Sequence, residues 1–210
     1  MFLKIKKNIR KILSFVLLII SGCLSFIYVY KEYNIDSQNK KKIEAFLNSN
    51  NYDSINKINN DNNNNRKIKS DIIDENYELI LEIPKINLKK GIYNYTSKNN
   101  DVNKNIMLLK QSNMPNVKNG NVILASHSGN SNISYFKYLN KLNINDDIII
   151  YYKGYKYIYK VNNLYKKEKK GVISIERNIN KNTLTLITCD KSDKNYQLVF
   201  IAYLDFYNTF

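Results

Sequence analysis

The sequence predicts a mainly β domain, either one closed barrel or a sandwich, that follows an N-terminal membrane-spanning helix. Short runs rich in Ile, Val, Tyr and Thr recur from Tyr77 onward, with Gly, Asn and Asp between them. An uncharged apolar run of 19 residues, Ile12 to Tyr30, lies near the N-terminus. The 210 residues include only 2 Cys and 1 His, so neither a disulfide framework nor a Cys/His zinc site holds the fold.

The 19-residue run has the length of a transmembrane anchor, because a helix needs about 20 apolar residues to cross the hydrocarbon core. Residues 1–11 carry five cations and no anion, whereas Lys31 after the run is offset by Glu32. The positive-inside rule therefore predicts a cytoplasmic basic tail over 1–11 and a single membrane pass over 12–30. Everything after the pass is expected outside the cytoplasm.

Two other interpretations of this segment remain open. A cleaved signal peptide could end at the small residues Ser21 and Gly22. A lipoprotein signal is the other reading, since the stretch that ends at Cys23 resembles a lipobox. The apolar run continues to Val29, which favours an uncleaved anchor. All three readings place the folded part outside the cytoplasm, so no nucleic-acid partner is expected despite a net charge of +15.

Residues 31–76 are polar and rich in Asn and Lys, and we expect them to form a stalk. Residues 77–206 are expected to form the barrel. A short helix is predicted over 134–142, where apolar residues fall at helical spacing and Ser134 is a candidate N-cap. The predicted strands are Tyr77–Ile83, Asn121–Ser126, Asp147–Tyr152, Tyr155–Asn163, Val172–Ile175, Thr183–Thr188 and Leu198–Leu204.

Two chemically distinctive side chains each end a predicted strand. Cys189 is the one thiol outside the anchor, and His127 is the one His in the chain. A thiol has an unperturbed pKa of about 8.5, and an adjacent imidazole can stabilise the reactive thiolate and protonate a leaving amine. The alternative is a structural Cys in the core and an unrelated His at the surface or in the core.

Four segments together resemble the sortase family, the Gram-positive cysteine transpeptidases. Thr185–Cys189 contains the TLxTC motif, and Ala125–Gly129 resembles the segment around the family's catalytic His. Leu81–Ile86 resembles the family's opening strand, and the predicted helix follows the His as it does in sortases. The resemblance covers about 77–204.

This resemblance implies a closed, eight-stranded, antiparallel β-barrel with one or two short helices. It implies that Cys189 attacks the Thr carbonyl of an LPXTG-like sorting signal, and that His127 serves as acid and base. The expected partners are surface proteins that bear such a signal, a peptidoglycan precursor or a pilin amine as acceptor, and the cytoplasmic membrane. No cofactor and no metal site are expected, since the sequence shows no clear carboxylate cluster.

The chain departs from the family at one position. Sortases carry an Arg on the strand after the Cys, and here Gln197 stands at that place. Gln197 could act as a neutral hydrogen-bond donor, or a loop cation such as Arg177, Lys191 or Lys194 could substitute. A barrel that binds sorting signals without cleaving them, and an endopeptidase that transfers the acyl group to water, remain alternatives.

Overall fold

The computed structural model describes residues 2–56 and 76–210. The first element is helix α1 (Phe2–Asn56), a single helix of 55 residues that contains the predicted anchor. Its apolar side chains from Leu13 to Tyr30 are exposed, and by length and composition this helix could cross a membrane. Residues 31–56, predicted as part of the stalk, continue the same helix, whereas 57–75 lie outside the described residues.

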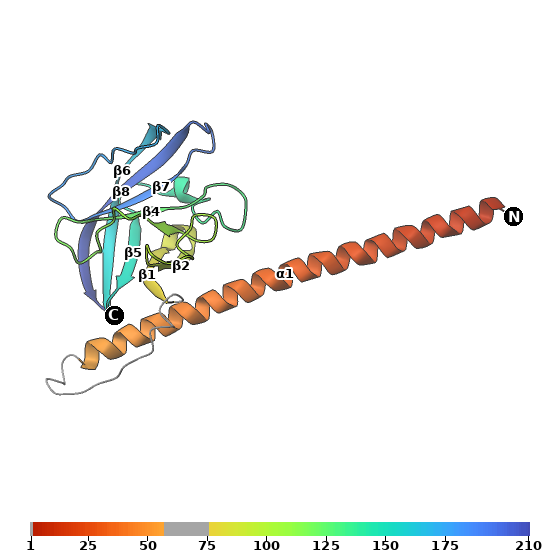
Figure 1. Cartoon of the computed structure of the whole chain (residues 1–210), viewed down its shortest axis with the longest axis horizontal. Coiled ribbons are helices and arrows are strands. Elements are labelled where there is room, and N and C mark those ends of the chain that lie inside the picture. Colours follow the sequence, from red (N-terminus) through yellow and green to blue (C-terminus); the bar gives the residue numbers. More distant parts are fainter. Residues whose placement is uncertain (1, 57–75) are drawn as a thin grey trace. The chain divides into compact units, whose positions relative to one another are not determined.

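Eight strands form one sheet that curls into a nearly closed barrel, as Figure 1 shows. The order across the sheet is β2-β1-β5-β6-β8-β7-β4-β3. The strands are β1 (Tyr77–Ile83), β2 (Leu88–Tyr93), β3 (Met107–Leu108), β4 (Asn121–Ala125), β5 (Asp147–Tyr152), β6 (Tyr155–Glu168), β7 (Thr183–Cys189) and β8 (Tyr196–Thr209). The predicted eight-stranded barrel is confirmed, but β4 and β7 pair in parallel, so the sheet is mixed. The long connection between β4 and β7 allows this pairing, because parallel strands need a crossover.

Alternate residues of each central strand fill the barrel. Leu184 and Leu186 of β7 belong to the core, as do Phe200 and Ala202 of β8. The residues that alternate with them, such as Ile187 and Val199, point to the other face of the sheet and are also buried. Burial of one such side chain stabilises a fold by roughly 1.5–3 kcal/mol. The two strands that carry the predicted site are therefore held rigidly from both faces.

The gap between the edge strands β2 and β3 is bridged by a side chain. Asn105 is buried, and its Nδ2 donates to the backbone oxygen of Gly91 in β2 at 2.8 Å. The ring of Tyr77 covers Gly91 so closely that a Cβ there would lie 2.1 Å from it. Only glycine permits this approach, which explains a glycine inside a strand.

Two short helices of the 3₁₀ type complete the domain, η2 (Pro84–Ile86) and η3 (Leu139–Lys141). The helix predicted over 134–142 is instead a series of turns that ends in η3. Its buried residues Phe136, Leu139 and Leu142 recur every three positions, which matches three residues per turn rather than 3.6.

The other strand predictions differ from the structure in three ways. Val172–Ile175 is not a strand, because the sheet positions beside β6 and β7 are already occupied by other strands. The segments that form β2 and β3 were not predicted, since one contains two Lys and a Gly and the other has two residues. β6 and β8 each extend to 14 residues, since they pair with each other along their lengths.

Candidate active site

The ends of β4 and β7 lie side by side. The parallel register sets Ala125 opposite Ile187. The contact continues beyond the ladder, since the Ser126 N–H donates to the oxygen of Ile187 at 3.2 Å and the Ser128 hydroxyl donates to the oxygen of Cys189 at 2.7 Å. The chain that carries His127 is therefore held next to Cys189.

Burial alternates along the segment after β4, which indicates on which face His127 lies. Ser126 and Ser128 are buried, whereas His127 between them is half-buried. Extended chain places alternate side chains on opposite faces. Continuing the register by two residues pairs His127 with Cys189 on one face, as the sequence motif predicts for an acid–base partner of a thiol.

The two threonines of the TLxTC motif join β7 to β4 and the segment after it by hydrogen bonds. The Thr185 hydroxyl donates to Oδ1 of Asn121 at 2.9 Å, and the Thr188 hydroxyl donates to the backbone oxygen of Ser126 at 2.8 Å. The side chains of Thr185, Thr188 and Asn121 are all buried. A buried hydroxyl needs such a partner, because an unpaired one costs free energy. The motif thus fixes the position of β4 relative to Cys189.

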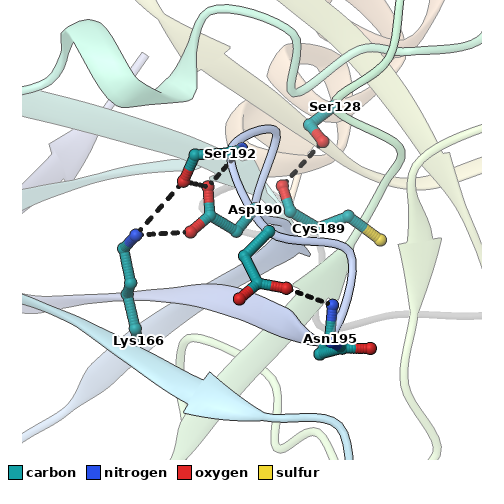
Figure 2. A network of polar contacts seen from close by, with 7 residues as sticks. Ser128, Lys166, Cys189, Asp190, Ser192 and Asn195 are labelled. Atoms are coloured by element: carbon teal, nitrogen blue, oxygen red, sulfur yellow. Dashed lines mark hydrogen bonds and ion pairs between the residues drawn. The ribbon is translucent and has the colours of Figure 1, made fainter.

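Cys189 ends β7 with an exposed side chain. Figure 2 shows its sulfur pointing away from the polar cluster formed by Lys166, Asp190 and Ser192. A pocket of about 240 Å³ lies at this end of β7, and Cys189 is one of the residues that line it. Its walls come from the segment after β4, the turn between β7 and β8, and the start of β8: Ser128, Phe136, Lys137, Asn140, Thr188, Cys189, Asp190, Lys191, Ser192 and Leu198.

The turn after Cys189 is braced by an ion pair. Nζ of Lys166 lies 2.6 Å from Oδ2 of Asp190, and the backbone N–H and hydroxyl of Ser192 donate to Oδ1 at 2.9 and 2.8 Å. These contacts, that of Lys166 foremost, lower the pKa of Asp190 to about 2. The Asp190 carboxylate thus binds Lys166 and Ser192 (Figure 2). These contacts order the chain on one side of Cys189.

An amide that the sequence did not reveal lies against the imidazole. Nε2 of His127 is 3.2 Å from Oδ1 of Asn103. The Asn103 Nδ2 donates to Asp101 at 3.2 Å, so its oxygen is the group that faces the ring and Nε2 carries the proton in this arrangement. The sequence gives no signal for Asn103, since it lies in a loop among several other Asn residues.

Gln197 of β8 is the direct cross-strand partner of Cys189. Antiparallel partners share a face and have Cβ atoms about 4.5–5.5 Å apart. The structure therefore brings Gln197 beside the thiol, where the family pattern places an Arg. Its amide can donate a hydrogen bond there, without the charge that makes such bonds roughly twice as strong.

Two of the candidate loop cations, Arg177 and Lys191, donate hydrogen bonds to oxygen atoms of the fold. Arg177 lies beside the first residue of β7, with Nη1 at 3.3 Å from the hydroxyl of Thr183 and 3.2 Å from the oxygen of Asn119. Lys191 is one of the residues that line the pocket, and its Nζ donates to the oxygen of Lys137 at 2.7 Å. Lys194 lies in the turn between β7 and β8, where its backbone carbonyl accepts a hydrogen bond from Nζ of Lys169 at 2.8 Å. The structure does not bring Arg177 to the thiol.

Within 2–56 and 76–210, no three His, Cys, Asp or Glu side chains gather in a way that could hold a metal ion.

A family model described as the sortase domain matches residues 81–205, more than half of the chain. The chain belongs to the sortase family. This match covers both strand ends described above and includes the TLxTC motif. No curated protein matches the chain.

Solved structures of sortases share the fold. Sortase D5 of Clostridium perfringens, described as a transpeptidase, is 21% identical with a TM-score of 0.57, over 79% of this chain and 97% of that chain. Sortase A of Listeria monocytogenes is 19% identical with a TM-score of 0.54, over 64% and 90%. Sortase C1 of Streptococcus agalactiae is 24% identical with a TM-score of 0.53, over 60% of this chain and 65% of that chain. Since sortases A, C and D all resemble the chain, its subclass is not assigned.

Proposed function

We propose that this sortase is a membrane-anchored cysteine transpeptidase, which cleaves an LPXTG-like sorting signal and transfers the acyl group to an amine. The observation that carries the proposal is the parallel pairing of β4 and β7, which holds the segment that contains His127 next to the strand end that carries the exposed Cys189. Cys189 and His127 are the residues to which we assign the chemistry.

The proposed reaction has two steps. The thiolate of Cys189 attacks the carbonyl carbon of the signal's Thr, and collapse of the tetrahedral intermediate breaks the Thr–Gly C–N bond while His127 protonates the departing amine. A thioester remains on Cys189. An incoming amine then loses a proton to His127 and attacks the thioester, which forms an amide bond and releases the thiolate.

The acceptor amine belongs, in this proposal, to a peptidoglycan precursor or to a pilin subunit. The apolar helix α1 anchors the enzyme by one pass, with 1–11 in the cytoplasm and the barrel outside. Sorting-signal proteins arrive at the same outer face of the membrane, so enzyme and both substrates meet there.

The test uses the full chain in detergent with a panel of fluorogenic LPXTG-type peptides, with and without triglycine as amine. We expect cleavage, and we expect a ligated product when the amine is present. Cleavage without ligation by any amine offered would support the endopeptidase alternative.

Gln197 favours one second candidate, a barrel that binds sorting signals and does not cleave them. Loss of a single oxyanion donor can raise the activation barrier by about 2.7–4 kcal/mol. Saturable binding of a sorting peptide with no cleavage over the whole panel would identify this candidate.

A further inference from the structure

Three side chains on neighbouring strands form one row that begins at the thiol. Cys189 on β7 pairs with Gln197 on β8, and Gln197 pairs in turn with Lys167 on β6. Both pairings are antiparallel, so all three side chains project from the same face of the sheet. Two steps of about 5 Å each place the Cβ of Lys167 about 10 Å from that of Cys189. Lys has a flexible four-carbon stem, which can span Gln197.

Lys167 is engaged in a partly exposed ion pair. Its Nζ lies 2.9 Å from Oε1 of Glu176, and the two side chains are 35% and 61% exposed. The Glu176 N–H donates to the hydroxyl of Tyr165 at 2.8 Å, so the acidic residue sits on a segment that is tied to β6. A pair this exposed adds little to folding. Lys167 can therefore exchange Glu176 for another anion at small cost.

Two neighbouring cations on or just after β6 differ from Lys167, whereas Lys191 and Lys194 lie in the turn after Cys189 and outside the β6–β8–β7 ladders. Lys166 lies on the opposite face of β6 and is paired with the nearly buried Asp190. Lys170 pairs with Glu168 beyond the end of the β6–β8 ladder. Among the described residues, Lys167 is the cation that the strand register places in the row of the thiol.

We infer that Lys167 supplies the positive charge that Gln197 lacks. When the carbonyl oxygen of the sorting signal becomes an oxyanion, the Lys167 ammonium leaves Glu176, lies over Gln197 and binds that oxygen together with the Gln197 amide. Glu176 holds the ammonium near the site until substrate arrives. This inference rests on the proposed function for the reaction itself, although a cation near Cys189 is also measurable without any substrate.

The first experiment measures peptide cleavage by the full chain and its variants. Lys167→Met should reduce kcat/KM at least tenfold without a change in Tm, and Lys167→Arg should keep most of the activity. Gln197→Arg should restore cleavage in the Lys167→Met background, because it returns a cation to the same row, and a purely structural role of Lys167 would not be rescued this way. Lys170→Met, which also removes one Lys of an exposed Lys–Glu pair, is the matched control and should equal the parent.

The second experiment requires no catalysis and separates this inference from the proposed function. Alkylation of Cys189 by the anionic iodoacetate is compared with alkylation by the neutral iodoacetamide, and the labelled Cys189 peptide is quantified by mass spectrometry. The iodoacetate-to-iodoacetamide rate ratio should fall roughly threefold or more in Lys167→Met. It should not change in Lys170→Met.

The outcomes are distinct. A parent that cleaves while Lys167→Met cleaves equally well overturns the inference and leaves the proposed function intact. A parent that cleaves no peptide contradicts the proposed function, and the alkylation ratio then decides the inference alone. An unchanged ratio in Lys167→Met overturns it in either case.

Discussion

Strand β7 begins at Thr183 beside Arg177 and ends at Cys189 beside Gln197. One end therefore has a cationic neighbour and the other a neutral one. The Arg177 guanidinium is surrounded by backbone oxygens and the Thr183 hydroxyl, groups that belong to the fold. At the other end the thiol is exposed and its nearest cross-strand neighbour is neutral. The ends are about 20 Å apart, at roughly 3.3 Å per residue. The hydrogen-bond partners of Arg177 therefore favour a structural role for it, although its residue type matches the family's Arg.

The largest effect is expected at the Cys189 end of the strand. Cys189→Ala should abolish cleavage of every sorting peptide, because no other described side chain can form the thioester there. The measurement is peptide cleavage by the full chain. Cys23→Ala removes the other thiol, which lies in helix α1, and should cleave as the parent does. Retained cleavage in Cys189→Ala would contradict the site.

His127→Ala should lower kcat by about 10²–10⁴, the usual contribution of one acid–base group. Substrate binding should change little, since the imidazole acts mainly on protons in transit. The check is a comparison of kcat and KM with those of the parent. A variant that loses binding but keeps kcat would assign His127 a substrate-binding role instead.

A smaller loss is expected from Gln197→Ala, more than tenfold in kcat/KM, since each ~1.4 kcal/mol of transition-state stabilisation is a factor of ten. Gln197→Arg should equal or exceed the parent if the site has room for the guanidinium. Parent-like cleavage by Gln197→Ala would remove the amide from the mechanism.

At the other end of β7, Arg177→Met should affect folding rather than catalysis. Hydrogen bonds from a charged donor contribute about 1.5–3 kcal/mol each, and Arg177 donates several, so the free energy of unfolding should fall by at least about 1.5 kcal/mol. Denaturant titration measures that change, and kcat/KM of the folded fraction should match the parent. An inactive but stable Arg177→Met would reverse the comparison and make Arg177 the missing cation.

The smallest effect concerns the Lys166–Asp190 pair and its dependence on pH. Because the pKa of folded Asp190 is lowered to about 2, its ionised form stabilises the fold above the unfolded pKa of about 3.9, and this contribution is lost as pH falls toward 2. Lys166→Met should therefore be less stable than the parent above pH 4, and the difference should shrink as pH falls and vanish below pH 2. A difference that stays constant through this window would show that the charge of Asp190 is not its cause.

Local residue patterns predicted the central strands of the barrel well. β1 and β5 have the predicted bounds, and β7 differs by one residue, because each combines β-branched residues with flanking turn residues. The parallel pairing of β4 with β7 was not predictable from such patterns. Strand direction is set by the crossover between them, which is a property of the whole chain.

The site was partly predictable for the same reason. Rarity and position at strand ends single out Cys189 and His127 as candidates, and the family pattern adds Gln197. The contact of Asn103 with His127 and the pairing of Lys167 with Gln197 were not predictable, since they depend on a distant loop and on the register of a third strand. Arg177 stood close to the Cys strand in sequence, yet the extended conformation of β7 separates it from Cys189.

The most direct test of the central claim is to trap the acyl-enzyme. The full chain is mixed with an LPXTG-type peptide in the absence of amine, quenched in acid, and digested for mass spectrometry. The account predicts the mass of the peptide's acyl fragment on the peptide that contains Cys189, removable by hydroxylamine and absent from Cys189→Ala. Cleavage of the sorting peptide with the adduct on another residue, or with an adduct that persists in Cys189→Ala, would contradict it.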